Sequence, residues 1–189
     1  MKIYNKIYVI DNFLSSNDFH KLKTSLLESR QWKFNSGTIL ESNSDLNLWD
    51  TQFTIMIYNN SMFFYNTPEL FNPIIDKLQM MSILKIKSNI SLYSGHNHTT
   101  NIFHDDLGLN SNKFSHPHYT SILYINNCNG YTEFKNGIKV HSKENRMLIF
   151  DGSYNHKAVK SYDSSYRCVI NFNYICNFTI NYDKYLESI

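Results

Sequence analysis

The chain has 189 residues, with 18 Lys and Arg against 16 Asp and Glu, so its net charge is only +2. This length provides one domain with a full hydrophobic core and leaves little room for a second. Acidic and basic residues are interspersed, which excludes the basic stripe that duplex nucleic acid requires. No apolar run is long enough to cross a membrane. We therefore expect one domain over residues 1–189, with neither duplex nucleic acid nor a membrane as partner.

The cysteines and the N-terminus favour a reducing compartment. The three Cys are an odd number without CxxC spacing, which argues against a disulfide framework. The first residues lack the apolar stretch of a signal peptide. Abundant Asn, Ile, Lys and Tyr, with few Ala, Pro and Gly, are typical of an AT-rich genome, viral or of a streamlined microbe. We expect a cytoplasmic protein, in the host cytoplasm if the genome is viral.

The N-terminal part, up to about residue 82, predicts helices and a few strands. Residues 6–10 have strand character, and Ser15 or Ser16 is a candidate cap for a helix over about 16–29. The polar segment 35–50 predicts a loop and residues 51–58 a strand. Pro68 suits a first helical turn, and the apolar spacing after it predicts a second helix to about Met81.

From residue 83 the pattern changes to short strands with turn dipeptides between them. Aromatic residues are abundant throughout, with 14 Tyr and 13 Phe, as suits β-structure. Asn136-Gly137 and Asp151-Gly152 are strong turn signals. The predicted strands are 83–93, 119–126, 131–134, 137–140, 146–150, 157–161 and 166–174. We expect a mainly β fold of the α+β kind, a β-sandwich or jelly roll over about 83–174, with the N-terminal helices packed on one sheet.

A His-x-Asp pair is the first chemical motif of the β-rich half. On an extended strand alternate side chains share a face, so His104 and Asp106 would point together and Asp105 away. His156, far along the chain, supplies a second imidazole. Two His and one carboxylate are the ligand set of a facial non-haem Fe(II) site, which leaves positions open for oxygen chemistry. We predict that His104, Asp106 and His156 form one metal site.

Arg167 adds a separate element eleven positions after His156. Its guanidinium is a permanently charged planar fork, suited to the far carboxylate of a dicarboxylic co-substrate. A competing metal set is present in His96-x-His98 and His116-x-His118, a spacing that cupin-type sites use. Both pairs lie in loop-like stretches, and Pro117 disrupts strand pairing. We expect these four His to line the site entrance rather than to bind the metal.

These residues resemble a known family, the 2-oxoglutarate- and Fe(II)-dependent dioxygenases, in its prolyl 4-hydroxylase-like branch. The resemblance covers about 83–174 and lies in the order and spacing of its blocks. The blocks are Ser91-Leu92-Tyr93, Phe103-His104-Asp105-Asp106, 120–127, Asn129-Gly130-Tyr131-Thr132-Glu133-Phe134, 145–151, His156 and Tyr166-Arg167-Cys168-Val169-Ile170-Asn171-Phe172. Tyr131 stands where the family often has a second Gly, and the stretch 94–103 is unusually polar.

The resemblance implies a double-stranded β-helix that is open at one end on the metal. It implies His104, Asp106 and His156 as iron ligands and Arg167 as the partner of the distal carboxylate of 2-oxoglutarate. Tyr124 matches a position whose hydroxyl shares that carboxylate, and Tyr93 matches another Tyr that faces the co-substrate. The implied cofactors are Fe(II), 2-oxoglutarate and O2, with ascorbate as a reductant of stalled iron.

The expected activity is hydroxylation of an unactivated carbon–hydrogen bond, with a peptidyl proline as the favoured target by similarity to the branch. A free amino acid or a nucleobase is an alternative substrate. A non-catalytic jelly-roll protein with a metal site is the alternative function, although such a protein has no need of Arg167. We expect segments 35–50, 94–102 and 107–118 to bound the substrate cleft, since long connections are commonly functional lids.

Overall fold

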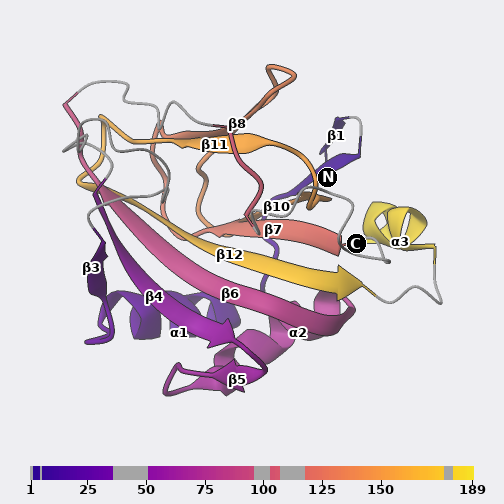
Figure 1. Ribbon diagram of the computed structural model, residues 1–189, viewed down its shortest axis with the longest axis horizontal. Coiled ribbons are helices and arrows are strands. Elements are labelled where there is room, and N and C mark those ends of the chain that lie inside the picture. The colour runs from indigo at the N-terminus through magenta and orange to yellow at the C-terminus, as the bar shows by residue number, and fades with distance from the viewer. Residues whose placement is uncertain (1, 5, 36–50, 96–102, 107–117, 177–180) are drawn as a thin grey trace.

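The structure is a computed structural model that describes residues 2–4, 6–35, 51–95, 103–106, 118–176 and 181–189. Its middle layer is a large antiparallel sheet of nine strands among these residues (Figure 1). The strand order is β1-β2-β10-β7-β12-β6-β4-β3, with β5 paired to β4. The bounds are β1 Lys2–Tyr4, β2 Ile7–Ile10, β3 Lys33–Asn35, β4 Gln52–Asn59, β5 Met62–Phe63, β6 Met80–Leu92, β7 His118–Tyr124, β10 Arg146–Asp151 and β12 Tyr166–Cys176.

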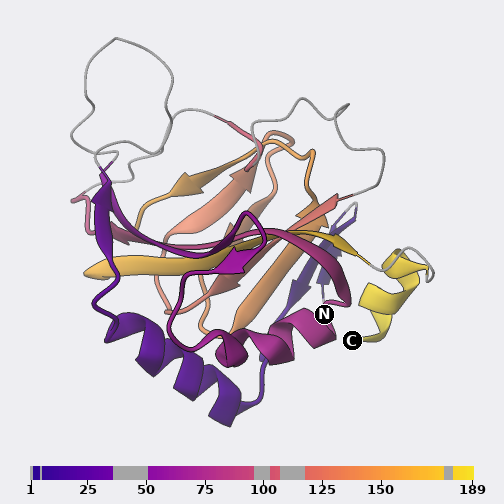
Figure 2. The ribbon, with the colours of Figure 1, turned by 60° about the horizontal axis from the view of Figure 1, so that its bottom comes forward.

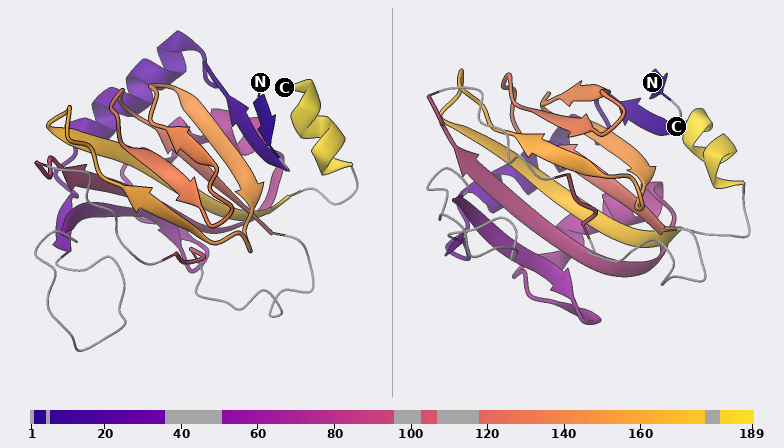
Figure 3. Two further views of the ribbon diagram at one scale, coloured as in Figure 1. Left: turned by 90° about the horizontal axis from the view of Figure 1, so that it is seen from above. Right: turned by 45° about the horizontal axis from the view of Figure 1, so that its top comes forward.

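A smaller sheet covers part of one face of the large sheet (Figure 3). It is formed by β11 (His156–Val159), β8 (Tyr131–Phe134) and β9 (Lys139–His141), in that order. Phe134 packs edge-to-face on Phe150 of the large sheet, with ring centroids 4.8 Å apart, a geometry that aromatic quadrupoles favour. The core between the two sheets also contains Ile122, Tyr124 and Leu148. These contacts hold the small sheet over one end of the large one.

Helices cover the opposite face of the large sheet (Figure 2). The first, α1 (Ser16–Leu27), is capped by Ser15, whose hydroxyl accepts a hydrogen bond from the Asp18 amide, a cap worth about 1 kcal/mol. Phe19, Leu22 and Leu26 recur at helical spacing and are buried against the sheet. The predicted helix over 16–29 and its cap at Ser15 are thus confirmed, with the end two residues earlier.

The second predicted helix is wrong at its C-terminal end. A 3-10 helix, η2 (Pro68–Phe71), leads into α2 (Asn72–Lys77), and Gln79 then adopts a left-handed φ of 48°. Met80 already belongs to β6, where it lies opposite Cys176 of β12. The apolar spacing reaches only to Leu78, and pairing with β12 takes over the residues after it.

The last residues, for which the sequence predicted no structure, form α3 (Tyr182–Ser188). The Tyr182 hydroxyl donates to the Leu78 carbonyl at 2.6 Å and the Tyr185 hydroxyl to the Lys77 carbonyl at 2.8 Å. These bonds fasten α3 to the end of α2. Among the described helices, none combines the length and the apolar character that a membrane crossing needs.

Strand alternation divides β6 and β12 between two environments. Cys168, Ile170 and Phe172 point to the core beneath the helices. The residues between them on β12, together with Lys85, Lys87, Asn89 and Ser91 of β6, face a cavity on the side of the small sheet. The expected fold, mainly β with helices on one sheet, is therefore confirmed, and its open face carries polar groups.

Candidate metal centre

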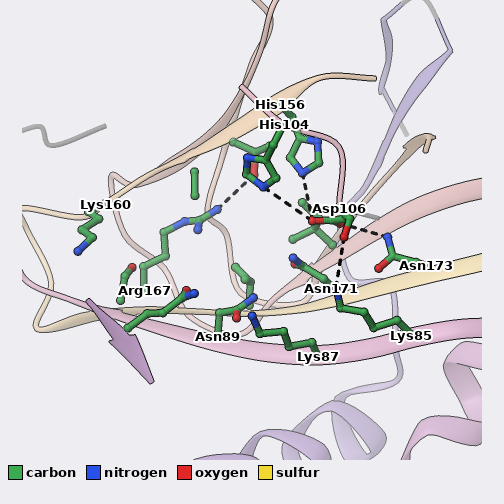
Figure 4. A pocket seen from close by; sticks show the side chains of 16 residues that line it. Lys85, Lys87, Asn89, His104, Asp106, His156, Lys160, Arg167, Asn171 and Asn173 are labelled. Atoms are coloured by element: carbon green, nitrogen blue, oxygen red, sulfur yellow. Dashed lines mark hydrogen bonds and ion pairs between the residues drawn. The ribbon is translucent and has the colours of Figure 1, made fainter. Parts of the chain in front are cut away.

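A cavity of about 170 Å³ is lined by strands of both sheets and by the short segment around His104. Its floor is formed by β6 and β12, and one wall by β11 and β8. Figure 4 shows side chains from these separate elements pointing into the same space.

His104 and His156 are joined through their backbones. The His104 amide donates to the His156 carbonyl and the His156 amide to the His104 carbonyl, each at 3.0 Å. This isolated antiparallel bridge is the only strand-like pairing of the segment 103–106, because Asp106 already lies in a turn. The expectation that His104 and Asp106 share a face of a regular strand is therefore corrected. Their side chains converge although Asp106 lies in a turn rather than on a regular strand.

The three predicted ligands lie together at the end of the cavity (Figure 4). Asp106 Oδ1 is 3.8 Å from His156 Nε2 and 4.0 Å from His104 Nε2, and all candidate ligand atoms lie within 4.8 Å of one another. Two metal bonds of about 2 Å from one centre span about 4 Å. The donor set of two imidazole nitrogens and one carboxylate thus fits a divalent transition metal such as Fe(II).

Hydrogen bonds hold these side chains in ligand-competent forms. His156 Nδ1 lies 3.1 Å from the Tyr154 carbonyl, so this nitrogen carries the proton and Nε2 keeps its lone pair facing Asp106. Burial lowers the pKa of His156, while the nearby Asp106 charge acts in the opposite direction. Asn173 donates to Asp106 Oδ2 at 3.2 Å.

Asp106 remains ionised although its carboxylate is almost enclosed. Burial by itself would raise the pKa of Asp106. The neighbouring imidazoles, the Asn173 amide and the ammonium of Lys85 outweigh that effect and hold the pKa below its usual value. A neutral imidazole beside an ionised carboxylate is the form in which both groups coordinate a cation.

Arg167 lines the same cavity and is 4% exposed. Its Nε donates to the Ser142 hydroxyl at 2.9 Å and its Nη2 to the Thr132 hydroxyl at 3.2 Å. Among the described residues no carboxylate forms an ion pair with it. A buried charge without a counter-ion is costly, so this arrangement favours an anionic ligand in the cavity.

Neither of the two tyrosines expected near the co-substrate is among the residues that line the cavity. Tyr124 is fully buried behind Arg167, whose guanidinium carbon is 5.4 Å from its ring centroid. Its hydroxyl donates to Thr132 Oγ1 at 2.8 Å, so Tyr124 contacts the cavity through Thr132 and Arg167, which both line it. Tyr93 is 57% exposed and lines a separate groove with Tyr162. Its placement does not support the co-substrate contact that the resemblance implied.

Of the four competing His, three (His96, His98 and His116) lie outside the described residues, as do most of the segments expected to bound the cleft. His118 is buried at the start of β7, and its ring packs so closely on Gly152 that no side chain fits there. His118 is absent from the lining of the cavity, so its placement does not support a role at the entrance.

Several residues that line the cavity were not predicted from the sequence. Lys85 and Lys87 of β6 and Asn171 and Asn173 of β12 all face the cavity. Each pair is spaced by one residue and alternates with buried neighbours such as Ile86 and Phe172. A period-two polar pattern within strands that are otherwise apolar was the available signal.

No family sequence model and no curated protein matches the chain in sequence. Solved structures match it in fold. A prolyl hydroxylase from Trichoplax adhaerens, in complex with an oxygen degradation domain peptide fragment of hypoxia inducible factor, is 19% identical, with a TM-score of 0.58 over 90% of this chain and 84% of that one. An oxidoreductase of the 2OG-Fe(II) oxygenase family from Burkholderia pseudomallei is 7% identical, with a TM-score of 0.62 over 90% and 85%.

A third match is SnoN, a non-haem α-ketoglutarate-dependent epimerase from nogalamycin biosynthesis. It is 11% identical, with a TM-score of 0.59 over 90% of this chain and 78% of that one. The chain thus has the jelly-roll fold that these 2OG-Fe(II) oxygenases share. Because the same fold carries hydroxylation and epimerisation, the reaction has to be inferred from the site.

Proposed function

We propose that this protein is an Fe(II)- and 2-oxoglutarate-dependent oxygenase that hydroxylates an unactivated carbon–hydrogen bond. One observation carries the proposal: the His104–Asp106–His156 cluster and the buried guanidinium of Arg167, which pairs with no carboxylate among the described residues, face the same cavity. A metal-binding protein without activity would need the cluster but not the arginine. The likeness in fold to 2OG-Fe(II) oxygenases supports the same reaction class.

In the proposed enzyme, His104, Asp106 and His156 hold the iron. Bound there with 2-oxoglutarate and O2, the metal would supply the oxidising chemistry, in which decarboxylation to succinate accompanies transfer of one oxygen atom to the substrate. Asp106 contributes the single negative charge of the ligand set. The Tyr154 carbonyl and the Asn173 amide orient His156 and Asp106.

Arg167 binds the distal carboxylate of 2-oxoglutarate in this proposal. Two of its nitrogens are already occupied by Ser142 and Thr132, which fix the plane of the guanidinium. The remaining donors are available to a carboxylate in the cavity. Tyr124 stacks behind the guanidinium and keeps water from that side.

For the substrate, we propose a peptide with proline as the hydroxylated residue. The Trichoplax adhaerens relative is a prolyl hydroxylase with a bound peptide, which supports this choice. The epimerase among the matches shows that small molecules also react on this fold, so a free amino acid or a nucleobase is the alternative.

The reaction class is tested by succinate release from 2-oxoglutarate, with and without added Fe(II). We expect release that depends on iron and is lost in Asp106→Ala. Iron-dependent release at the same rate in that variant would contradict the proposed site.

The substrate class is tested by screening proline-containing peptides against free amino acids and nucleosides. The readout is a mass gain of one oxygen atom. Peptide hydroxylation supports the favoured substrate, whereas hydroxylation of only a nucleoside would overturn it and leave the reaction class standing.

A further inference from the structure

The cavity contains positively charged side chains beyond Arg167, the one that the proposed function uses. Lys85, Lys87 and Arg167 line it, and among the described lining residues Asp106 supplies the one carboxylate. A divalent cation and a doubly charged 2-oxoglutarate would cancel each other, so the positive excess persists in the loaded enzyme. In a concave site such an excess of positive charge attracts a further anion.

Lys85 and Lys87 form the floor of the cavity beneath the metal cluster (Figure 4). Lys85 Nζ donates to the backbone carbonyl of Asp106 at 3.2 Å, and neither lysine forms an ion pair with an acidic side chain among the described residues. Burial, and then repulsion by Lys85, lowers the pKa of Lys87. Among the described residues Asp106 is the one carboxylate that acts on both lysines, and the metal cluster shares it, so a further bound anion would relieve the repulsion between the two ammonium groups.

Hydrogen-bond acceptors without donors lie on the same floor. The side-chain oxygens of Asn89 and Asn171 are buried and have no hydrogen-bond partner among the described residues. Both residues line the cavity, and Figure 4 shows Asn171 between Asp106 and Asn89. Leaving a buried acceptor unpaired costs about 1–3 kcal/mol, so a ligand with an N–H group would stabilise this floor.

The opposite side of the cavity serves the co-substrate. In Figure 4 Arg167 and Lys160 approach the cavity from one side, whereas Lys85 and Lys87 lie beneath the metal cluster. Arg167 is held by Thr132 and Ser142 of the smaller-sheet side, which separates its role from that of the two floor lysines. The cavity therefore offers a second anion position, distinct from the one at Arg167.

We infer that the hydroxylated substrate carries a carboxylate, which Lys85 and Lys87 bind, next to an N–H group that donates to Asn89 or Asn171. An acidic residue within a peptide and a free acidic amino acid both offer this pair of groups. The inference rests on the proposed function, because it places the substrate in the cavity of the iron and 2-oxoglutarate. It narrows the substrate from any peptide to one that is acidic near the reacting carbon.

The test measures binding to the protein loaded with Fe(II) and 2-oxoglutarate under nitrogen, where turnover does not proceed. Dye-labelled, capped peptides with one proline flanked by Glu, Gln or Lys are compared by fluorescence anisotropy. We expect the Glu peptide to bind about ten- to a hundredfold more tightly than its Gln twin, as charged hydrogen bonds predict. The Lys peptide should bind most weakly.

Variants test whether Lys85 and Lys87 bind the carboxylate of the peptide. Lys85→Met and Lys87→Met should each reduce the preference for Glu over Gln, and Lys87→Glu should shift it toward the Lys peptide. Lys139→Met removes a lysine of β9 outside the cavity and should keep the wild-type preference. Equal binding of all three peptides to wild type would overturn the inference.

Two further experiments complete the test. The first distinguishes a peptide carboxylate from that of a free amino acid, and the second tests the proposed function independently of the inference. Free glutamate is titrated as a competitor beside free glutamine. Lysine-dependent binding of glutamate without binding of the peptides would assign the site to a free amino acid. Calorimetry of 2-oxoglutarate with the iron-loaded protein is the separate check. If wild type does not bind 2-oxoglutarate, the proposed function is contradicted. If Lys85→Met and Lys87→Met bind 2-oxoglutarate more weakly than wild type, these lysines contact the co-substrate, and only the inference about the substrate is overturned.

Discussion

His104 and His156 exchange both of their backbone hydrogen bonds at 3.0 Å, although they come from distant parts of the sequence. The bridge fixes the two Cα positions relative to each other before any side chain is considered. Their imidazole centroids lie 5.2 Å apart and both face Asp106. The candidate metal centre is therefore preorganised by backbone pairing, and the ligands need no large rearrangement to meet a cation.

Removing the carboxylate should abolish metal binding while leaving the fold intact. Asp106→Ala deletes the only anionic ligand, and since Asp106 is held by Asn173 at the cavity wall its loss opens no hydrophobic core. We expect Fe(II) binding by calorimetry to disappear and iron-dependent turnover to fall below about one-tenth of wild type. Asp105→Ala is the matched control and should keep both, and a circular dichroism spectrum like that of wild type should show that each variant folds.

Arg167 should determine the affinity for 2-oxoglutarate. Arg167→Ala leaves the distal carboxylate without its charged donor, and we expect affinity to fall by about ten- to a hundredfold. Arg167→Lys keeps the charge but loses the planar fork and its bonds to Thr132 and Ser142, so its affinity should lie between the two. Arg30→Lys, at an exposed position, serves as control. An unchanged affinity in Arg167→Ala would assign the carboxylate to another residue.

Gly130 should be required for the position of Arg167. A Cβ at Gly130 would lie 2.7 Å from Arg167 Cδ and 2.9 Å from the Val159 carbonyl. Gly130→Ala should therefore destabilise the protein by about 1–3 kcal/mol and also weaken 2-oxoglutarate binding. Gly137→Ala is the control, because its φ of 85° costs stability while no atom lies within 4 Å of the added Cβ. Urea unfolding and calorimetry should show a stability loss in both variants and a binding loss only in Gly130→Ala.

Asp11 should make stability depend on acid pH. Its carboxylate accepts from Arg146 Nε at 2.6 Å and from Lys143 Nζ at 2.8 Å, and these partners, Arg146 first, lower the pKa of Asp11 to about 2. Because the folded-state pKa lies below the unfolded one, near 3.8, the stabilisation is complete above that pH and is lost as the pH falls toward 2.

The matching measurement is urea unfolding of Asp11→Asn at several pH values. The Asp11 side chain is 37% exposed, so solvent screening reduces the loss at pH 7 to about 1 kcal/mol. The difference from wild type should shrink as the pH approaches 2. Asp76→Asn, at a carboxylate that makes no ion pair among the described side chains, should show no such convergence. A constant deficit for Asp11→Asn across the pH range would contradict the ion pair.

Local patterns were sufficient for much of the fold. The Ser15 cap and the spacing of Phe19, Leu22 and Leu26 predicted α1, and β-branched and aromatic runs predicted the main strands to within a few residues. The sequence also singled out His104, Asp106, His156 and Arg167, because these residue types suit a metal and a carboxylate. Helix caps, strand alternation and ligand chemistry depend on near neighbours, so the chain order alone reveals them.

The composition of the cavity was decided by tertiary structure. Lys85 and Lys87 meet Asn171 and Asn173 only because β6 and β12 pair in one register, with Ser91 opposite Arg167. The same pairing places Met80 in β6 rather than in the predicted helix. Tyr93 is not among the residues that line the cavity. Register between distant strands depends on the combined burial of both faces of the sheet, and a shift of one residue would exchange those faces. No single segment contains that information, which is why the cationic floor became visible only in the folded chain.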